Sequence, residues 1–154
     1  MYIAIGSDHA GFEYKEAVKK YLNKYGHKVT DFGTFSKESC DYPDFGFRVA
    51  EAVAQGKFER GILICNTGIG MSIIANKVPD IRAALCWNTK TAKSASDHNK
   101  TNILCLAQGM TGLGEVKKMI SLWLGTSFTG GRHLRRVNKI RKFEKKYLKE
   151  VRQK

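Results

Sequence analysis

Short apolar segments alternate with longer amphipathic segments along the whole chain of 154 residues. The short segments are nearly continuous in apolar residues, which is typical of strands buried on both faces of a parallel sheet, and they cover residues 2–6, 28–32, 61–65, 83–86 and 103–106. Apolar residues recur at helical spacing between them, over residues 12–25, 43–55, 68–77, 89–96 and 113–124. The alternation predicts five βα units in one open, doubly wound α/β sheet.

A last amphipathic segment, residues 132–152, differs from the others in its charge. Its apolar stripe has helical spacing and consists of Val137, Ile140, Phe143, Tyr147 and Val151. The chain has a net charge of +13, and residues 132–154 hold eleven basic and two acidic residues, so +9 of that charge falls at this end. The pattern predicts a basic terminal helix that docks through its stripe on its own domain or on a partner subunit. Because the segment is strongly basic, an arm that binds nucleic acid is the alternative interpretation.

Length and composition narrow the class of protein. A chain of this length is expected to form a single domain over residues 1–154, and 42% hydrophobic residues are ordinary for a folded protein. The sequence has no apolar run of about 18 residues and no basic segment before its first apolar residues, so we expect neither a membrane span nor a secretory signal. The four cysteines are far apart, which argues against a zinc site or a disulfide framework and favours the cytoplasm.

Candidate chemistry lies in the loops after the first and third strands, because ligands of doubly wound sheets bind at the carboxyl ends of the strands. After the first strand, Asp8 and His9 provide an acid and a base beside a glycine-rich turn, although Asp8 is also a good helix cap and His9 an ordinary surface residue. After the third strand, the thiol of Cys65 precedes a glycine-rich turn whose N–H groups can bind an anion. Cys86 and Cys105 fall inside strands and are expected to be structural.

Basic residues in the last third of the chain add further candidates. His98 lies in a polar segment, 97–102, which we expect to be a loop before the fifth strand, and it is suited to general acid or base catalysis there. His27 has no such polar neighbours and is expected at the surface. Arg132 and Arg136 are four residues apart and share one helix face, a geometry suited to binding one phosphate group, whereas Arg135 points elsewhere.

Together these motifs resemble the type B ribose-5-phosphate isomerases and the related isomerases of six-carbon sugar phosphates. The resemblance rests on six motifs that follow the family's order and span nearly the whole chain: Gly6-Ser7-Asp8-His9-Ala10-Gly11, Asp41-Tyr42-Pro43, Cys65 with Thr67-Gly68-Ile69-Gly70, Ala75-Asn76-Lys77, His98-Asn99 with Thr101-Asn102, and Gly130-Gly131-Arg132-His133 with Arg136-Val137. It implies a Rossmann-like domain that forms a homodimer or a dimer of dimers, with active sites shared across the interface. It implies neither a metal nor a cofactor.

The resemblance also implies roles in proton transfer. The thiolate of Cys65 is the base that moves a proton between C1 and C2 of the open-chain sugar, and His98 donates a proton to the ring oxygen during ring opening. Asp8 and Tyr42 lie near the sugar hydroxyls. The catalytic residues implied are Cys65, His98, Thr67 and Asp8. The charge of the enediolate is held by the backbone of one loop, which consists of Asn66, Thr67, Gly68, Ile69 and Gly70.

Residues of two subunits hold the substrate phosphate, by the same resemblance. His9 comes from one subunit, and the neighbouring subunit supplies Arg132 and Arg136, with Asn99 also lining the site. The same neighbouring subunit supplies His98 for ring opening. Some members of the family carry the base as a glutamate at the position of Met71, but this chain retains Cys65. We therefore expect the thiol mechanism, which a helix N-terminus beside Cys65 favours.

Two positions depart from the family pattern. Asn66 stands where glycine is common, and Gly109 stands where many members carry a further phosphate-binding arginine. The loss of that contact weakens phosphate binding by about 1.5–3 kcal/mol unless Arg135 or Lys100 replaces it. We expect a small phosphorylated sugar as substrate and interconversion of ribose 5-phosphate and ribulose 5-phosphate as the reaction. An isomerase of a six-carbon substrate, such as allose 6-phosphate or galactose 6-phosphate, is the alternative, and a nucleic-acid-binding protein is the less favoured one.

Overall fold

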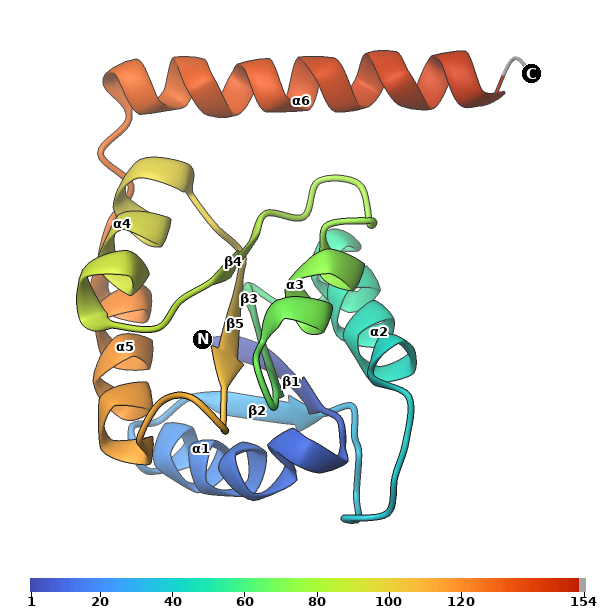
Figure 1. Ribbon diagram of the computed structural model, residues 1–154. Coiled ribbons are helices and arrows are strands. Elements are labelled where there is room, and N and C mark those ends of the chain that lie inside the picture. The colour runs from blue at the N-terminus through green and yellow to red at the C-terminus, as the bar shows by residue number, and fades with distance from the viewer. Residues whose placement is uncertain (153–154) are drawn as a thin grey trace.

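Strands and helices alternate along the chain in the computed structural model, which describes residues 1–152, with side chains through residue 148 (Figure 1). The strands are β1 (Tyr2–Ser7), β2 (Lys28–Asp31), β3 (Arg60–Cys65), β4 (Ala83–Leu85) and β5 (Ile103–Ala107). The helices are the short 3-10 helix η1 (His9–Gly11), α1 (Phe12–Lys24), α2 (Tyr42–Ala54), α3 (Ile69–Ala75), α4 (Thr89–Asn99), α5 (Leu113–Gly125) and α6 (Gly131–Arg152). Each predicted strand and helix is confirmed, and all but one end fall within two residues of the prediction.

The five strands form one parallel sheet in the order β2-β1-β3-β5-β4. Because every neighbouring pair is parallel, all strands end at one edge of the sheet, here called the carboxyl edge, and begin at the opposite one, the amino edge. In the central pair, Gly61 of β3 lies beside Ile103 of β5, and Cys65 lies beside Ala107. This topology confirms a doubly wound, Rossmann-like α/β fold with an additional C-terminal helix.

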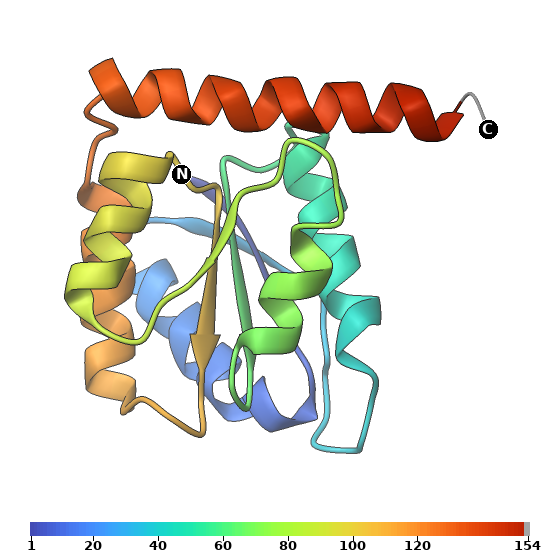
Figure 2. The same cartoon turned by 45° about the horizontal axis from the view of Figure 1, so that its top comes forward.

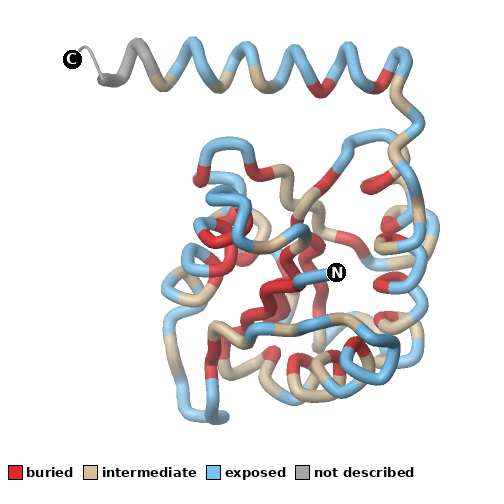
Figure 3. The backbone as a smooth tube through the Cα atoms, turned by 180° about the vertical axis from the view of Figure 1, so that it is seen from behind, coloured by how far each residue is buried: buried red, intermediate tan, exposed pale blue. Residues whose placement is uncertain are grey.

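Both faces of the sheet are covered, which explains why the central strands β1, β3 and β5 are almost wholly buried and mostly apolar, whereas the edge strand β2 is polar and only partly buried (Figure 3). Side chains alternate between the faces, so Ile62 and Ile64 of β3 enter a core formed with α1, α4 and α5. Leu63 and Cys65 enter the second core, formed with α2 and α3. The thiol of Cys65 therefore lies on the α2–α3 side of the sheet, at the carboxyl edge.

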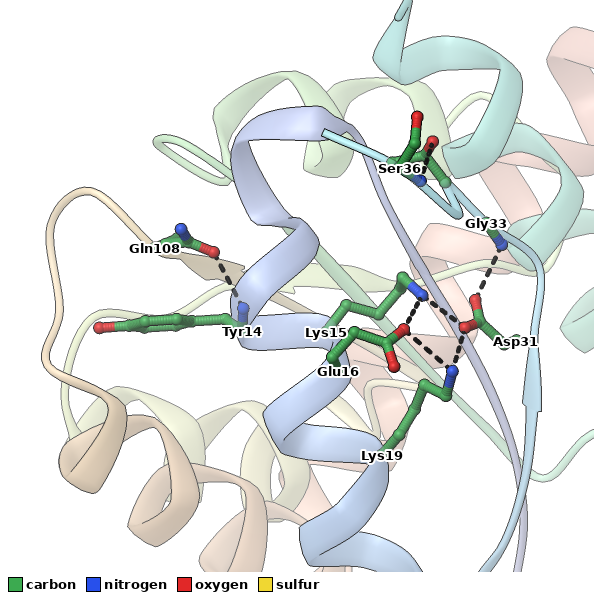
Figure 4. A network of polar contacts seen from close by, with 9 residues as sticks. Tyr14, Lys15, Glu16, Lys19, Asp31, Gly33, Ser36 and Gln108 are labelled. Carbon is green, nitrogen blue, oxygen red and sulfur yellow. Dashed lines mark hydrogen bonds and ion pairs between the residues drawn. The ribbon is translucent and has the colours of Figure 1, made fainter. Parts of the chain in front are cut away.

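A network of charged side chains ties α1 to the end of β2 (Figure 4). Lys15 is fully buried, and its Nζ pairs with Asp31 Oδ2 and lies 2.7 Å from Glu16 Oε1. Lys19 Nζ joins the same two carboxylates at 2.5 and 3.0 Å. Burial alone raises the pKa of Asp31, but the hydrogen bonds from the two lysines bring that pKa below its ordinary value. Gly33 N donates to Asp31 Oδ1 at 2.9 Å, so the network also fixes the start of the segment that leads to α2.

The fourth helix extends three residues beyond the predicted end, and this is a correction. His98 and Asn99 lie in the last turn of α4 and not in a loop. The helix ends at Lys100, which takes the left-handed conformation with φ 49°. Lys100 N and Thr101 N then donate to Ser96 O and Ala95 O, at 3.2 and 3.1 Å, and satisfy the last carbonyls. Glycine usually occupies such a position, so a lysine there gave no sign in the sequence that the helix ends at this point.

Helix α6 crosses the amino edge of the sheet and extends past the rest of the molecule (Figures 1 and 2). Only the start of its apolar face is covered, where Val137 is buried. Farther along, Ile140, Phe143 and Tyr147 are 51%, 67% and 67% exposed. The side chain of Val151 lies outside the described residues. In the part of the chain that is described, no helix is long and apolar enough to span a membrane.

Candidate active site

Strand β3 places Cys65 at the carboxyl edge, where the chain turns into α3. The side chain is buried, and its Sγ accepts a hydrogen bond from Gly68 N at 3.0 Å. Gly68 has φ 74°, a conformation that glycine adopts readily, and this turn returns its N–H to the sulfur. Ile69 N donates to Thr67 Oγ1 at 3.3 Å, while the N–H of Gly70, in the first turn of α3, has no acceptor within the helix. The loop thus combines a thiol, a donor directed at its sulfur, and a further N–H available to a ligand.

Asp8 and His9 follow β1 at the same edge. Asp8 Oδ1 accepts a hydrogen bond from Gly11 N at 3.0 Å, so Asp8 does cap the following turn, and its burial raises the pKa of the carboxyl group. His9 Nδ1 accepts a hydrogen bond from Cys40 N at 3.2 Å. Because a backbone N–H can only donate, the neutral His9 ring carries its proton on Nε2, which is left as a donor for a ligand.

Tyr42 completes this group from the first turn of α2. Asp41 is the residue before the helix, but its side chain makes no capping hydrogen bond. The ring of Tyr42 lies against Gly70, where an added Cβ would come within 2.7 Å of the ring. The structure therefore brings together, at the carboxyl edge, the predicted site residues Asp8, His9, Tyr42, Cys65, Asn66, Thr67, Gly68, Ile69 and Gly70.

The remaining predicted residues form a second group at the amino edge. His98 and Asn99 are exposed at the end of α4, and Arg132 and Arg136 are exposed in the first turns of α6. The two helices meet where the rings of His98 and His133 stack, with centroids 4.3 Å apart and planes 3° apart. His98 and Arg132 are therefore neighbours, although 34 positions separate them in the sequence.

The two groups lie on opposite sides of the molecule. Cys65 is level with Ala107 at the end of β5, whereas His98 precedes β5, which begins at Ile103. The four residue-to-residue steps from Ile103 to Ala107 rise about 13 Å along the strand. The two groups are farther apart than that, so a five- or six-carbon sugar phosphate cannot contact both groups of one chain.

The two departures from the family pattern, Asn66 and Gly109, contact each other. Gly109 N donates to Asn66 O at 2.9 Å. A Cβ at position 109 would lie 3.0 Å from Asn66 Cγ and 3.1 Å from Asn66 O, and closer still to Asn66 Oδ1. The side chain of Asn66 therefore occupies the space that a side chain at position 109 needs.

Two contributors were not identified from the sequence. The backbone N–H of Cys40 sets the tautomer of His9. Any residue except proline could make this contact, so the sequence could not predict it. His133 was noted only as part of a motif. It lies four residues before Val137 and so continues the apolar stripe of α6, and this spacing could have predicted that His133 is buried. His27 is half-buried with an unpartnered Nδ1 among the described residues, so its description as a surface residue was only partly correct.

Comparisons with known proteins identify the class of enzyme. The family model described as Ribose/Galactose Isomerase matches residues 3–140. Ribose-5-phosphate isomerase B of Escherichia coli is 43% identical over 144 residues, which are 94% of this chain and 97% of that protein. D-erythrulose-4-phosphate isomerase of Pectobacterium atrosepticum is 41% identical over 143 residues, covering 92% and 94% of the two chains. The solved structure of Clostridium thermocellum ribose-5-phosphate isomerase B has a TM-score of 0.94 and 52% identity, and the match covers 96% of this chain and 99% of that one.

A Rossmann-like sheet with this set of relatives defines an aldose–ketose isomerase that acts on sugar phosphates. The chain belongs to the Ribose/Galactose Isomerase family.

Proposed function

We propose that this protein interconverts ribose 5-phosphate and ribulose 5-phosphate, with Cys65 as the base, as a single domain over residues 1–154. The observation that carries the proposal is the hydrogen bond from Gly68 N to Cys65 Sγ at the end of β3. A donor directed at the sulfur is the contact that a thiolate needs, and it is made beside the N–H of Gly70, which is available to an oxygen of the substrate. The reaction requires these two features in one pocket.

The proton transfer follows from this arrangement. The thiolate of Cys65 takes the proton from C2 of the open-chain aldose, and the C–H electrons form the C1–C2 double bond of an enediolate. The N–H of Gly70 and those of Asn66 and Thr67 stabilise the charge on oxygen. The protonated thiol then returns the proton to C1, while a proton moves from O2 to O1, which gives the ketose. Buried Asp8, whose pKa is raised by its burial, and Tyr42 bind the hydroxyls.

Ring opening and phosphate binding require a second copy of the chain, because the residues assigned to them lie at the amino edge. His98 of the neighbouring subunit donates the proton to the ring oxygen. Its Arg132 and Arg136, together with Asn99, hold the phosphate against His9 of the first subunit, where two guanidinium groups four residues apart suit one phosphate group. The assembly is a homodimer or a dimer of dimers. The exposed part of the apolar stripe of α6, formed by Ile140, Phe143 and Tyr147, supports it, since such a surface is commonly buried in a subunit interface.

The six-carbon substrate remains the alternative, and the Asn66–Gly109 contact is the observation that favours it. Gly109 offers no charged side chain, and Asn66 offers an amide that can bind a hydroxyl. Lys100 is the better replacement for the missing arginine, because it directly follows Asn99, whereas Arg135 lines a different hollow with Leu134 and Lys139. We also propose the cytoplasm as the location, because all four cysteines are free thiols.

A panel of five- and six-carbon aldose phosphates tests the activity. The native protein should turn over ribose 5-phosphate fastest, and Cys65→Ala should lose turnover by a factor of about 1,000 or more, as expected for loss of the base. Cys86→Ala is the matched control, because that thiol is buried in the other core, and it should retain activity. Full activity of Cys65→Ala would refute the thiol mechanism, and a preference for a six-carbon substrate would establish the alternative.

Mixing two inactive variants tests whether sites are shared. Cys65→Ala and His98→Ala should each be inactive, but a hybrid dimer has one site with both residues intact. Re-equilibrated mixtures should therefore recover about a quarter of the native activity, since half the dimers are hybrids with one good site in two. No recovery from a mixture that exchanges subunits would refute the shared site.

A further inference from the structure

His133 is the buried residue where the first turns of α6 meet α4. It is only 8% exposed, while its neighbours in sequence, Arg132 and Leu134, are exposed. Its ring is nearly parallel to that of His98, with centroids 4.3 Å apart. The ring of His133 therefore supports one face of the His98 ring, whose Nε2 also lies 3.7 Å from Asp97 Oδ2.

A second contact joins His133 to the phosphate-binding group. Arg132 Nε donates to His133 Nε2 at 3.5 Å, a long hydrogen bond that requires an unprotonated Nε2. Burial, together with the positive charges of His98, Arg132 and Arg136, lowers the pKa of His133, while Asp97 acts in the opposite direction. The lowered pKa favours the neutral ring, in which Nε2 can accept the hydrogen bond from Arg132.

The backbone around His133 is itself fixed. His133 N donates to Gly130 O at 2.9 Å, and Thr129, just before α6, donates through its N–H to Asp97 O at 3.1 Å. The hydroxyl of Thr129 also pairs with the carboxylate of Asp97, which is the neighbour of His98 in α4. His133 therefore sits on a rigid connection between the two helices, which is what a residue that positions others requires.

We propose that His133 is a positioning residue for this enzyme: its ring orients His98 for ring opening and its Nε2 orients Arg132 for phosphate binding, without contacting the substrate. This inference rests on the proposed function, which assigns those roles to His98 and Arg132. Stacking and hydrogen bonding are separate properties of the ring, so they can be removed separately.

Two substitutions of His133 separate the contributions. His133→Phe keeps a flat ring but removes the acceptor, so kcat with ribose 5-phosphate should stay within about twofold while KM rises about three- to tenfold, as for a weak hydrogen bond to a charged group. His133→Asn keeps a polar acceptor but removes the ring, so kcat should fall about tenfold. The matched control is the same pair of changes at His27, which is outside both groups and should leave both constants unchanged.

A four-carbon substrate isolates ring opening. Erythrose 4-phosphate carries its phosphate on the C4 oxygen and so cannot close a furanose ring. Its kcat should be spared in His133→Asn and His98→Ala but lost in Cys65→Ala. A merely structural role of His133 would lower kcat for both sugars in parallel with the melting temperature, and that result would overturn the proposal.

Proton NMR of the imidazole Cε1–H signals tests the stacking without any turnover. The chain has four histidines, so the His98 signal can be assigned by single substitutions. It should shift downfield in His133→Asn, which removes the ring current, and change little in His133→Phe. An unmoved His98 signal in the folded Asn variant would overturn the proposal. Failure of the proposed function would be recognised by a different result, namely full activity of the Cys65→Ala variant.

Discussion

Substitution of Gly109 tests whether the Asn66–Gly109 contact shapes the site. In Gly109→Ala the new Cβ falls 3.0 Å from Asn66 Cγ and nearer to Asn66 Oδ1, so the Asn66 side chain has to turn away. Asn66 is exposed, and the turn costs about 1 kcal/mol, as for a side chain displaced from its rotamer. Since Asn66 directly follows Cys65, we expect this displacement to lower kcat/KM about fivefold, the equivalent of that energy.

A double-mutant cycle measures the coupling. In an Asn66→Gly background the obstructing side chain is gone, and only the 3.1 Å contact with the backbone oxygen of residue 66 remains. Gly109→Ala should therefore have a much smaller effect there, and the coupling energy should be about 1 kcal/mol. Gly109→Arg should likewise be harmful alone and tolerated beside Asn66→Gly. Gly114→Ala serves as the control, because nothing lies within 4 Å of an added Cβ there. Initial rates with ribose 5-phosphate and melting temperatures provide the data, and additive effects of the two substitutions would refute the reasoning.

Other predictions concern the buried charges and thiols. Asp31→Asn should lower the free energy of unfolding by about 1.5–3 kcal/mol, the value for a hydrogen bond to a charged group, because Lys15 keeps only its other partner. Folding lowers the pKa of Asp31 below its ordinary value of 3.8. The ionised carboxylate therefore contributes its full share to the free energy of unfolding above pH 3.8, and this share is lost as the pH falls through the lower pKa of the folded protein. Urea titrations should therefore show a steeper loss of stability in acid for the native protein than for Asp31→Asn, and equal slopes would contradict this. Burial raises the pKa of Cys86 to about 11 and that of Cys105 well above its ordinary value, so at pH 8 a thiol reagent should label half-buried Cys40 first and reach these two only on unfolding.

The strand pattern was predictable because burial on both faces leaves a direct mark on the sequence. Apolar runs such as 61–65 and 103–106 needed no long-range information, and the short loops between them left only one class of fold. The end of α4 was not predictable in the same way. It depends on a lysine in a left-handed conformation, and the polar residues 97–99 are compatible with either a helix or a loop.

The candidate site was predictable to the extent that it follows the strand ends. Cys65, Asp8 and His9 were placed at one edge by topology alone, because they directly follow buried strands. Contacts between distant residues were not predictable: the side chain of Asn66 against Gly109, the Cys40 N–H on His9. These contacts depend on where loops from different βα units meet, and the arrangement of such loops cannot be derived from a single sequence.

The position of His98 follows from the fold and explains why a second chain is needed in the proposed mechanism. A helix that leads into a strand of a parallel sheet must end at the amino edge, because every strand begins there. Cys65, at the end of a strand, must lie at the carboxyl edge. A base on a strand end and an acid on a helix end of the same doubly wound sheet therefore never share one pocket. If both act on one sugar, the acid has to come from another copy, and catalysis then depends on the contact between copies. Helix α6 combines the features that such a contact requires, since Arg132 and Arg136 lie in its first turns and an exposed apolar stripe continues along it.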